Sequence, residues 1–187
     1  EKYILYIKNK VAKCIGILYR ARKYLGRRYL IDLYNTLMLP FFNYCSIIWA
    51  NTAEKYLNPL ILMQKRAIRV ICNLRKRDST SLYFKGLSIL KLPDLYKYNT
   101  LIFMYKFFHK LLPNSLTDFF SYNWQIHKYN TRQRWKFHVP KFKLNIRKEF
   151  VAYTGVQLWN AMSDNVDAQL KISNFKRKVK NYYLDMY

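Results

Sequence analysis

The chain has 187 residues, of which 34 are Lys or Arg and only 10 are Asp or Glu, so its formal net charge is +24. Because 51% of the residues are apolar, the chain can form a sizeable core, and this excludes wholesale disorder. A protein with this charge attracts polyanions, so we expect nucleic acid as its first partner, an anionic membrane surface second and acidic proteins third.

The positive charge is concentrated in two blocks. Residues 1–77 hold 16 basic and 3 acidic side chains and residues 128–187 hold 13 and 4, whereas residues 78–127 hold 5 and 3. This distribution is typical of two binding surfaces on one core more than of a basic tail.

Long helices are expected, because four glycines and five prolines are few for a chain of this length. Residues 3–25 predict a first helix, with Gly26 as the left-handed residue after its end. Its apolar face is predicted to hold Ile4, Ile7, Val11, Cys14 or Ile15, and Leu18.

Two more helices are predicted in the first half of the chain. Residues 28–39 predict a second helix, which Pro40 either kinks or ends. A helical pattern resumes after this proline. Asn51 or Thr52 can cap the following helix, which is predicted to run to about Arg75.

The second half predicts shorter helices and a change of pattern. We expect a short helix after the loop RKRDSTS, then a helix from Pro93 or Asp94 to the residue before Pro113, and a short helix within 114–125. An extended or hairpin segment is expected at about 128–148. It is followed by a helix over EFVAYTGVQLWNAM and a final basic helix over about 173–186. The prediction is therefore a mainly α fold.

The stretch MQKRAIRVICNLRKR, residues 63–77, carries six cations and no acid. At about 100° per residue it sorts into an apolar and a basic face. The apolar face holds Met63, Ala67, Val70, Ile71 and Leu74. The basic face holds Lys65, Arg66, Arg69, Lys76 and Arg77, with Asn73 among them. Most such runs are solvated faces, but no acid relieves the repulsion here, so a bound anion would stabilise this helix.

Residues for catalysis or metal binding are not grouped in the sequence. The ten acids are scattered, and Asp164 with Asp167 fits the start of a helix better than a metal site. His109, His127 and His138 stand apart from one another and from the cysteines, and no phosphate-binding glycine motif occurs. The sequence therefore predicts no enzyme activity for this chain on its own.

The three cysteines, Cys14, Cys45 and Cys72, are too far apart for a metal-binding pair and predict buried free thiols in a reducing compartment. No signal peptide is visible, and the longest apolar run, LMLPFFNYCSIIWA, is too short and too interrupted to span a bilayer. Because the chain begins with Glu1, we expect it to be a piece of a longer polypeptide.

Basic residues alternate with aromatic ones in HKYNTRQRWKFHVPKFKLNIRK, residues 127–148. Cations can neutralise phosphates, and exposed rings can stack on unpaired bases. We expect the cations of this segment to contact phosphate, whereas rings such as Trp135 are expected to fill the core.

Several segments together resemble a known family. Reverse transcriptases of non-LTR retrotransposons of the jockey and CR1 kind have similar segments in the same order. The segments that carry this resemblance are KCIGILYRARKYLGRRYLIDLYNTLMLPFFNYCSIIWANT, the helix MQKRAIRVI, the TRQR and GVQLWNAM motifs and the final basic helix. The resemblance covers essentially the whole chain and places it after the polymerase palm.

The resemblance implies a thumb-like helical bundle over residues 1–77 and a C-terminal extension over 78–187. It implies that the chain holds RNA or DNA, as template–primer duplex or element RNA, during target-primed reverse transcription, inside the cell in cytoplasm and nucleus. The palm, with its Mg²⁺, and the endonuclease would belong to the same polypeptide; no cofactor and no membrane are expected for this part. The nucleic-acid-binding residues expected are Lys65, Arg66, Arg69, Lys76, Arg77, Arg132, Arg134, Lys136, Arg147, Lys148, Lys176 and Arg177.

Three other interpretations stay open. Basic amphipathic helices can adsorb to an anionic membrane surface. A degenerate element can leave a structural interaction module without affinity for nucleic acid. The thumb-like domain of intron maturases is a closer relation, although the C-terminal motifs fit it less well.

Overall fold

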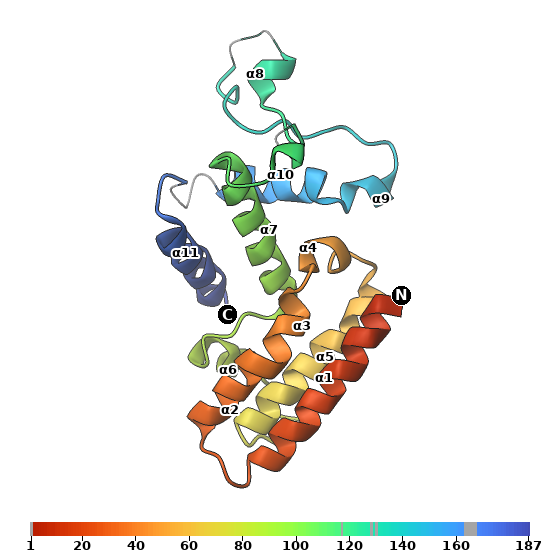
Figure 1. Ribbon diagram of the computed structural model, residues 1–187, viewed down its shortest axis with the longest axis vertical. Coiled ribbons are helices and arrows are strands. Elements are labelled where there is room, and N and C mark those ends of the chain that lie inside the picture. Colours follow the sequence, from red (N-terminus) through yellow and green to blue (C-terminus); the bar gives the residue numbers. More distant parts are fainter. Residues whose placement is uncertain (1, 117, 128, 130, 163–167) are drawn as a thin grey trace. The chain divides into compact units, whose positions relative to one another are not determined.

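The computed structural model describes residues 2–116, 118–127, 129, 131–162 and 168–187, and these are mainly α-helical, as predicted (Figure 1). No β-strand occurs within these ranges; the nearest feature is an isolated antiparallel bridge between Tyr122 and Phe137. The chain forms two compact units, Glu1–Tyr96 with Asn181–Tyr187, and Lys97–Lys180. This division differs from the predicted one after residue 77.

The first unit is a helical bundle. Its helices are α1 (Lys2–Ala21), α2 (Arg27–Leu33), the π-helix η1 (Tyr34–Met38), α3 (Leu39–Asn43), α4 (Ser46–Trp49), α5 (Glu54–Ile71) and α6 (Ser81–Gly86). The two long helices, α1 and α5, lie side by side and run in the same direction (Figure 1). The chain between them, through α2, η1 and α3, packs on α1 and adds its own buried side chains to the same core.

The predicted apolar face of α1 is confirmed, because both alternatives at its centre, Cys14 and Ile15, are buried together with the other predicted residues. The predicted end of the helix is wrong. The helix stops at Ala21, and Gly26 has φ −68° and ψ 163°, an extended conformation that any residue adopts. Turn hydrogen bonds from the Tyr24 and Leu25 N–H groups to the Ala21 carbonyl reverse the chain, so no left-handed glycine is needed.

The second helix does not end at Pro40, and a π-helical segment precedes the proline. The helix continues through a π-helical segment, in which the Leu39 N–H donates to the Tyr34 carbonyl. A proline lacks the N–H for an ordinary helical bond and clashes with the carbonyl four residues earlier, and the wider π turn relieves both. The buried side chains Leu30, Tyr34, Met38 and Phe42 thereby stay on one side, at a spacing of four residues.

The helix α5 begins and ends at other residues than predicted. The residue at its N-cap is Ala53, without a side-chain cap, and its last residue is Ile71. The Leu74 N–H donates to the Arg69 carbonyl (2.9 Å) and Asn73 has φ 53°, which together form a Schellman motif. The predicted helix to about Arg75 is therefore wrong, because an asparagine in left-handed conformation ends it first.

A buried glutamine ties the first unit together. The Gln64 Nε2 donates to the Tyr34 hydroxyl (3.0 Å) and to the Leu90 carbonyl (2.9 Å), and its Oε1 accepts the Leu92 N–H (2.9 Å). Burial raises the pKa of Tyr34 to about 12, although the Gln64 hydrogen bond acts in the opposite direction. These bonds attach the segment 90–92 to α5 and η1.

The second unit contains shorter elements. It includes most of α7 (Leu92–Phe108), the 3₁₀ turn η2 (Asn114–Leu116), α8 (Asn123–Ile126), α9 (Asn145–Lys148), α10 (Val151–Met162) and most of α11 (Ile172–Asp185). The predicted helices over EFVAYTGVQLWNAM and 173–186 match α10 and α11. The helix α7 stops before Pro113, because Lys110, at φ 53°, forms another Schellman motif with the Leu111 N–H on the Lys106 carbonyl.

Aromatic rings form much of the core of the second unit. Phe107 packs edge-on against Phe120 at a centroid distance of 4.7 Å, and Tyr105 lies 4.5 Å from Phe175. Gly155 lies where α10 approaches α7, since a Cβ there would be 3.1 Å from the Met104 sulfur. The segment predicted as extended has no regular strand in its described part and ends in the short helix α9.

Candidate nucleic-acid interface

The basic face of α5 carries three of the predicted residues. Arg66 is exposed, and Lys65 and Arg69 are half-buried. The Arg69 Nε donates to the Asp78 carbonyl (3.1 Å), while the Asp78 carboxylate accepts the Arg75 N–H (2.8 Å). Arg69 therefore holds the following loop against α5, a structural role beside any role in binding.

Lys76 and Arg77 are exposed on that loop instead of on the helix. Because the Arg69 side chain fastens the loop at Asp78, both residues stay next to the C-terminal end of α5. Within the described part of the chain, no carboxylate forms an ion pair with Lys65, Arg66, Arg69, Lys76 or Arg77. Lys65, Arg66 and Arg69 thus lie on α5, whereas Lys76 and Arg77 lie on the loop that follows it and not on the predicted helix.

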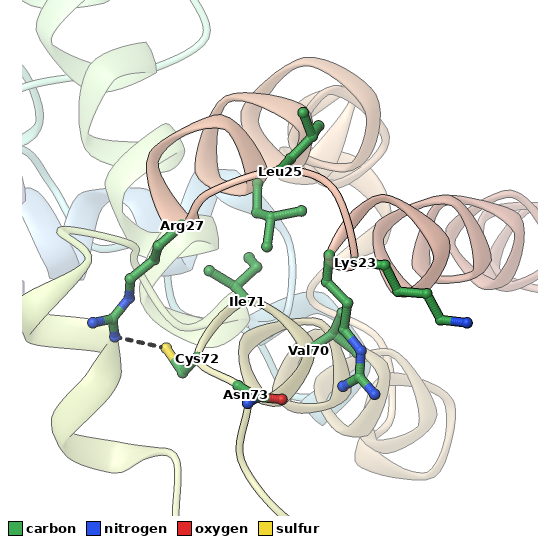
Figure 2. A pocket seen from close by; sticks show the side chains of 9 residues that line it. Lys23, Leu25, Arg27, Val70, Ile71, Cys72 and Asn73 are labelled. Atoms are coloured by element: carbon green, nitrogen blue, oxygen red, sulfur yellow. Dashed lines mark hydrogen bonds between the residues drawn. The ribbon is translucent and has the colours of Figure 1, made fainter.

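A pocket of about 380 Å³ lies between the α1–α2 loop and the C-terminal end of α5 (Figure 2). Its lining residues are Arg22, Lys23, Leu25, Arg27, Leu30, Val70, Ile71, Cys72 and Asn73. Figure 2 shows the Arg27 guanidinium directed at Cys72, whose sulfur accepts its hydrogen bond (2.9 Å). The pocket therefore combines an apolar floor with three cations.

The three cations Arg22, Lys23 and Arg27 were not among the predicted residues. The run RARKYLGRR, residues 20–28, was the signal that could have indicated them. Arg22 and Lys23 follow the C-terminus of α1, where cations are favourable in themselves because they face the negative end of the helix dipole; Arg27 begins α2. The same position adds them to the positive surface at this end of the first unit.

In the second unit, residues 121–127 and 131–138 form a loop that we call the aromatic loop. Backbone N–H groups of Asn123 and Trp124 donate to the carbonyls of Lys136 and Arg134, each at 3.1 Å. The Asn160 side chain on α10 bonds the backbone of Phe137 on both sides, accepting its N–H (3.2 Å) and donating to its carbonyl (2.8 Å). The aromatic loop is thus fixed to α10.

The rings of the aromatic loop divide between core and surface. Phe137 is buried, as expected, but Trp135 is 70% exposed and Trp124 is 45% exposed. The prediction that Trp135 fills the core is therefore wrong: Asn160 fixes the backbone at the buried Phe137, whereas Trp135, two residues earlier, lies in a turn that exposes it. The Arg134 guanidinium lies 4.8 Å from the Trp135 ring centroid.

The other predicted cations of the second unit are spread over three elements. Arg132 is exposed on the aromatic loop, whereas the Lys136 Nζ reaches the Asn160 carbonyl at 3.5 Å. On α9, Arg147 is exposed and lies 5.9 Å from the Phe142 ring, and Lys148 is half-buried. On α11, Lys176 and Arg177 are exposed, opposite the buried Phe175 and Val179. Only Arg132, Arg134 and Lys136 are held together by a shared loop.

Two histidines of the aromatic loop, His127 and His138, lie near each other. The His138 ring lies 5.7 Å from that of His127, and its Nδ1 is 3.2 Å from the Asn123 Oδ1. Burial lowers the pKa of His138, and the nearby His127 and Lys141 lower it further.

The described residues hold no group of three His, Cys, Asp or Glu side chains that could bind a metal ion. Asp164 and Asp167 lie outside the described residues. None of the helices in the described ranges is both long and apolar enough to cross a bilayer.

Comparisons with known proteins give no further assignment. No family model matches the chain, and neither a curated protein nor a solved structure matches it.

Proposed function

We propose that this chain binds nucleic acid through its phosphates, without catalysis of its own, as the C-terminal part of a retrotransposon RNA-directed DNA polymerase. In this role it holds the template–primer duplex or the element RNA during target-primed reverse transcription. The Mg²⁺ and the carboxylates of the reaction belong to the palm, the DNA-cleaving activity belongs to the endonuclease, and the protein works in the cytoplasm and nucleus.

The observation that carries this proposal is the cation cluster at the C-terminal end of α5. Lys65 and Arg66 on the helix, and Lys76 and Arg77 on the fastened loop, have no carboxylate partner among the described residues. Arg22, Lys23 and Arg27 add positive charge beside them. Such a surface repels itself, and a phosphate backbone with its regularly spaced charges would relieve the repulsion.

The geometry favours contact with the backbone over contact with base edges. The cations come from two helices, α2 and α5, and from the loops that follow α1 and α5. Phosphate contacts position a strand and carry no sequence information directly. We therefore expect tight binding that depends weakly on sequence and strongly on salt.

The test uses the double variant Lys65→Glu/Arg66→Glu and leaves Arg69 intact, because Arg69 also holds the loop 75–78. We expect its affinity for an RNA–DNA duplex to fall at least about tenfold at matched salt, with a shallower slope of log affinity against log salt. Fluorescence anisotropy of a labelled duplex measures both.

The matched control is Lys8→Glu/Lys13→Glu, which changes the net charge equally at two exposed positions of α1. If both variants lose affinity to the same extent, net charge and not this cluster binds the duplex. If the first variant binds like the parent, the cluster is not an interface.

Binding to a membrane surface is the alternative function, and it can be tested with the same protein. Flotation with anionic liposomes in the presence of competing RNA separates the two functions, because lipid binding that RNA does not compete away would favour the membrane.

A further inference from the structure

In the aromatic loop, near-parallel rings lead from the core to the surface. The Tyr122 ring lies 4.6 Å from the buried Phe137 ring at an interplanar angle of 19°, and 6.3 Å from the exposed Trp124 ring at 15°. The Trp124 ring is the exposed end of this set of near-parallel rings. A further flat ring can extend it.

Trp135 adds a second exposed ring on the same loop. The Trp124 N–H bonds the carbonyl of Arg134, the residue before Trp135, so the two tryptophans belong to paired parts of one loop. Exposing a tryptophan ring to water is unfavourable. Because hydrogen bonds fix the loop, the two rings stay exposed at its surface, where a ligand can contact them.

The charge around these rings defines the occupant. No acidic residue occurs between Asp118 and Glu149, whereas Arg132, Arg134 and Lys136 lie within the loop. Flat rings beside cations match a polyanion that also carries flat rings. Bases in a duplex are already stacked on both faces, so only unpaired bases can reach the tryptophans.

We propose that the aromatic loop binds single-stranded nucleic acid by stacking unpaired bases on Trp124 and Trp135, with phosphates on Arg132 and Arg134. This inference rests on the proposed function. It assigns single-stranded nucleic acid to the second unit. The first unit holds phosphates alone, whereas the second unit holds bases as well.

The test compares three probes on the whole chain: a single-stranded oligo(dT), a duplex of the same length, and heparin, which carries negative charge without bases. Trp49 and Trp159 are buried, so quenching of tryptophan fluorescence reports on Trp124 and Trp135. We expect oligo(dT) to quench the emission strongly, and heparin to bind with little quenching.

The variant Trp124→Ala/Trp135→Ala should lose at least about tenfold in affinity for oligo(dT), because stacking is sequence-tolerant and strong for each base. Its affinities for heparin and duplex should stay within about twofold. The variant Trp124→Phe/Trp135→Phe should recover most of the loss, and Tyr44→Ala, at a residue 67% exposed in the first unit and away from the cation cluster, should change nothing. Circular dichroism confirms that each variant is folded.

Three results would overturn the inference. Equal losses for oligo(dT) and heparin would mean that the tryptophans support the loop and do not stack. Unchanged affinity for oligo(dT) would mean that bases bind elsewhere. Quenching by anionic vesicles that oligo(dT) cannot reverse would assign the rings to a membrane. The proposed function fails separately, when the parent binds none of the nucleic acids more tightly than heparin of equal charge.

Discussion

Both units use a side-chain amide to fix a segment that is distant in sequence, but they do so in different surroundings. In the first unit the buried Gln64 bonds the Leu90 carbonyl and the Leu92 N–H. In the second unit the half-buried Asn160 bonds the N–H and the carbonyl of Phe137. The same type of amide-to-backbone hydrogen bonding joins segments of a helical bundle in one unit and fixes a loop in the other.

The cores around Gln64 and Asn160 differ, and so do the surfaces that the two sets of hydrogen bonds support. Around Gln64 the core is formed by helices, and the cations project from rigid elements whose positions the core fixes. Around Asn160 the core is aromatic, with Phe137 buried in it and Trp135 exposed on the loop. The first unit thus offers charge on helices and the loops that follow them, and the second offers rings on a loop.

The largest effect is expected from Gln64→Leu. The change leaves the Tyr34 hydroxyl, the Leu90 carbonyl and the Leu92 N–H buried without their present partner, so the free energy of unfolding should fall by about 3 kcal/mol. Urea unfolding followed by far-UV circular dichroism measures it. Asn58→Leu, at an exposed position of the same helix, should stay within about 0.5 kcal/mol. Equal effects of the two changes would contradict the role of Gln64.

A smaller loss is expected from Asn160→Leu, because the Asn160 side chain is only half-buried whereas Gln64 is fully buried. The free energy of unfolding should fall by about 1.5 kcal/mol. The emission of Trp135 should also change, since the change removes the bonds that orient this part of the loop. The control is Gln157→Leu at an exposed position of α10. Lower stability with unchanged emission would show that the aromatic loop keeps its form without Asn160.

The smallest effect is a pH dependence at His138. Burial, with the charges of His127 and Lys141, lowers the pKa of His138 below the usual 6.5. The unfolded chain therefore binds a proton more readily than the folded chain, so the contribution of neutral His138 to stability is complete above pH 6.5 and declines as the pH falls below it. Unfolding midpoints at pH 7.5 and 5.5 should differ less in His138→Gln than in the parent. An equal difference in both would assign the dependence to other groups.

The apolar periodicity of α1 determined its buried face, including both Cys14 and Ile15, because helical spacing alone decides which residues share a side. The final basic helix followed in the same way, since Phe175 and Val179 are buried four residues apart. The lack of acids over residues 63–77 likewise indicated a basic cluster before any geometry was known.

Tertiary structure decided where elements end and where rings point. The conformation of Asn73 ends α5, and the π turn before Pro40 lets a helix continue that local rules expect to kink or end. Asn160, 23 residues later in the chain, fixes the backbone of the buried Phe137, whereas Trp135, two residues before Phe137, faces solvent. Local spacing fixes a face, but ends and exposure depend on bonds between segments far apart in the chain, which no local pattern contains.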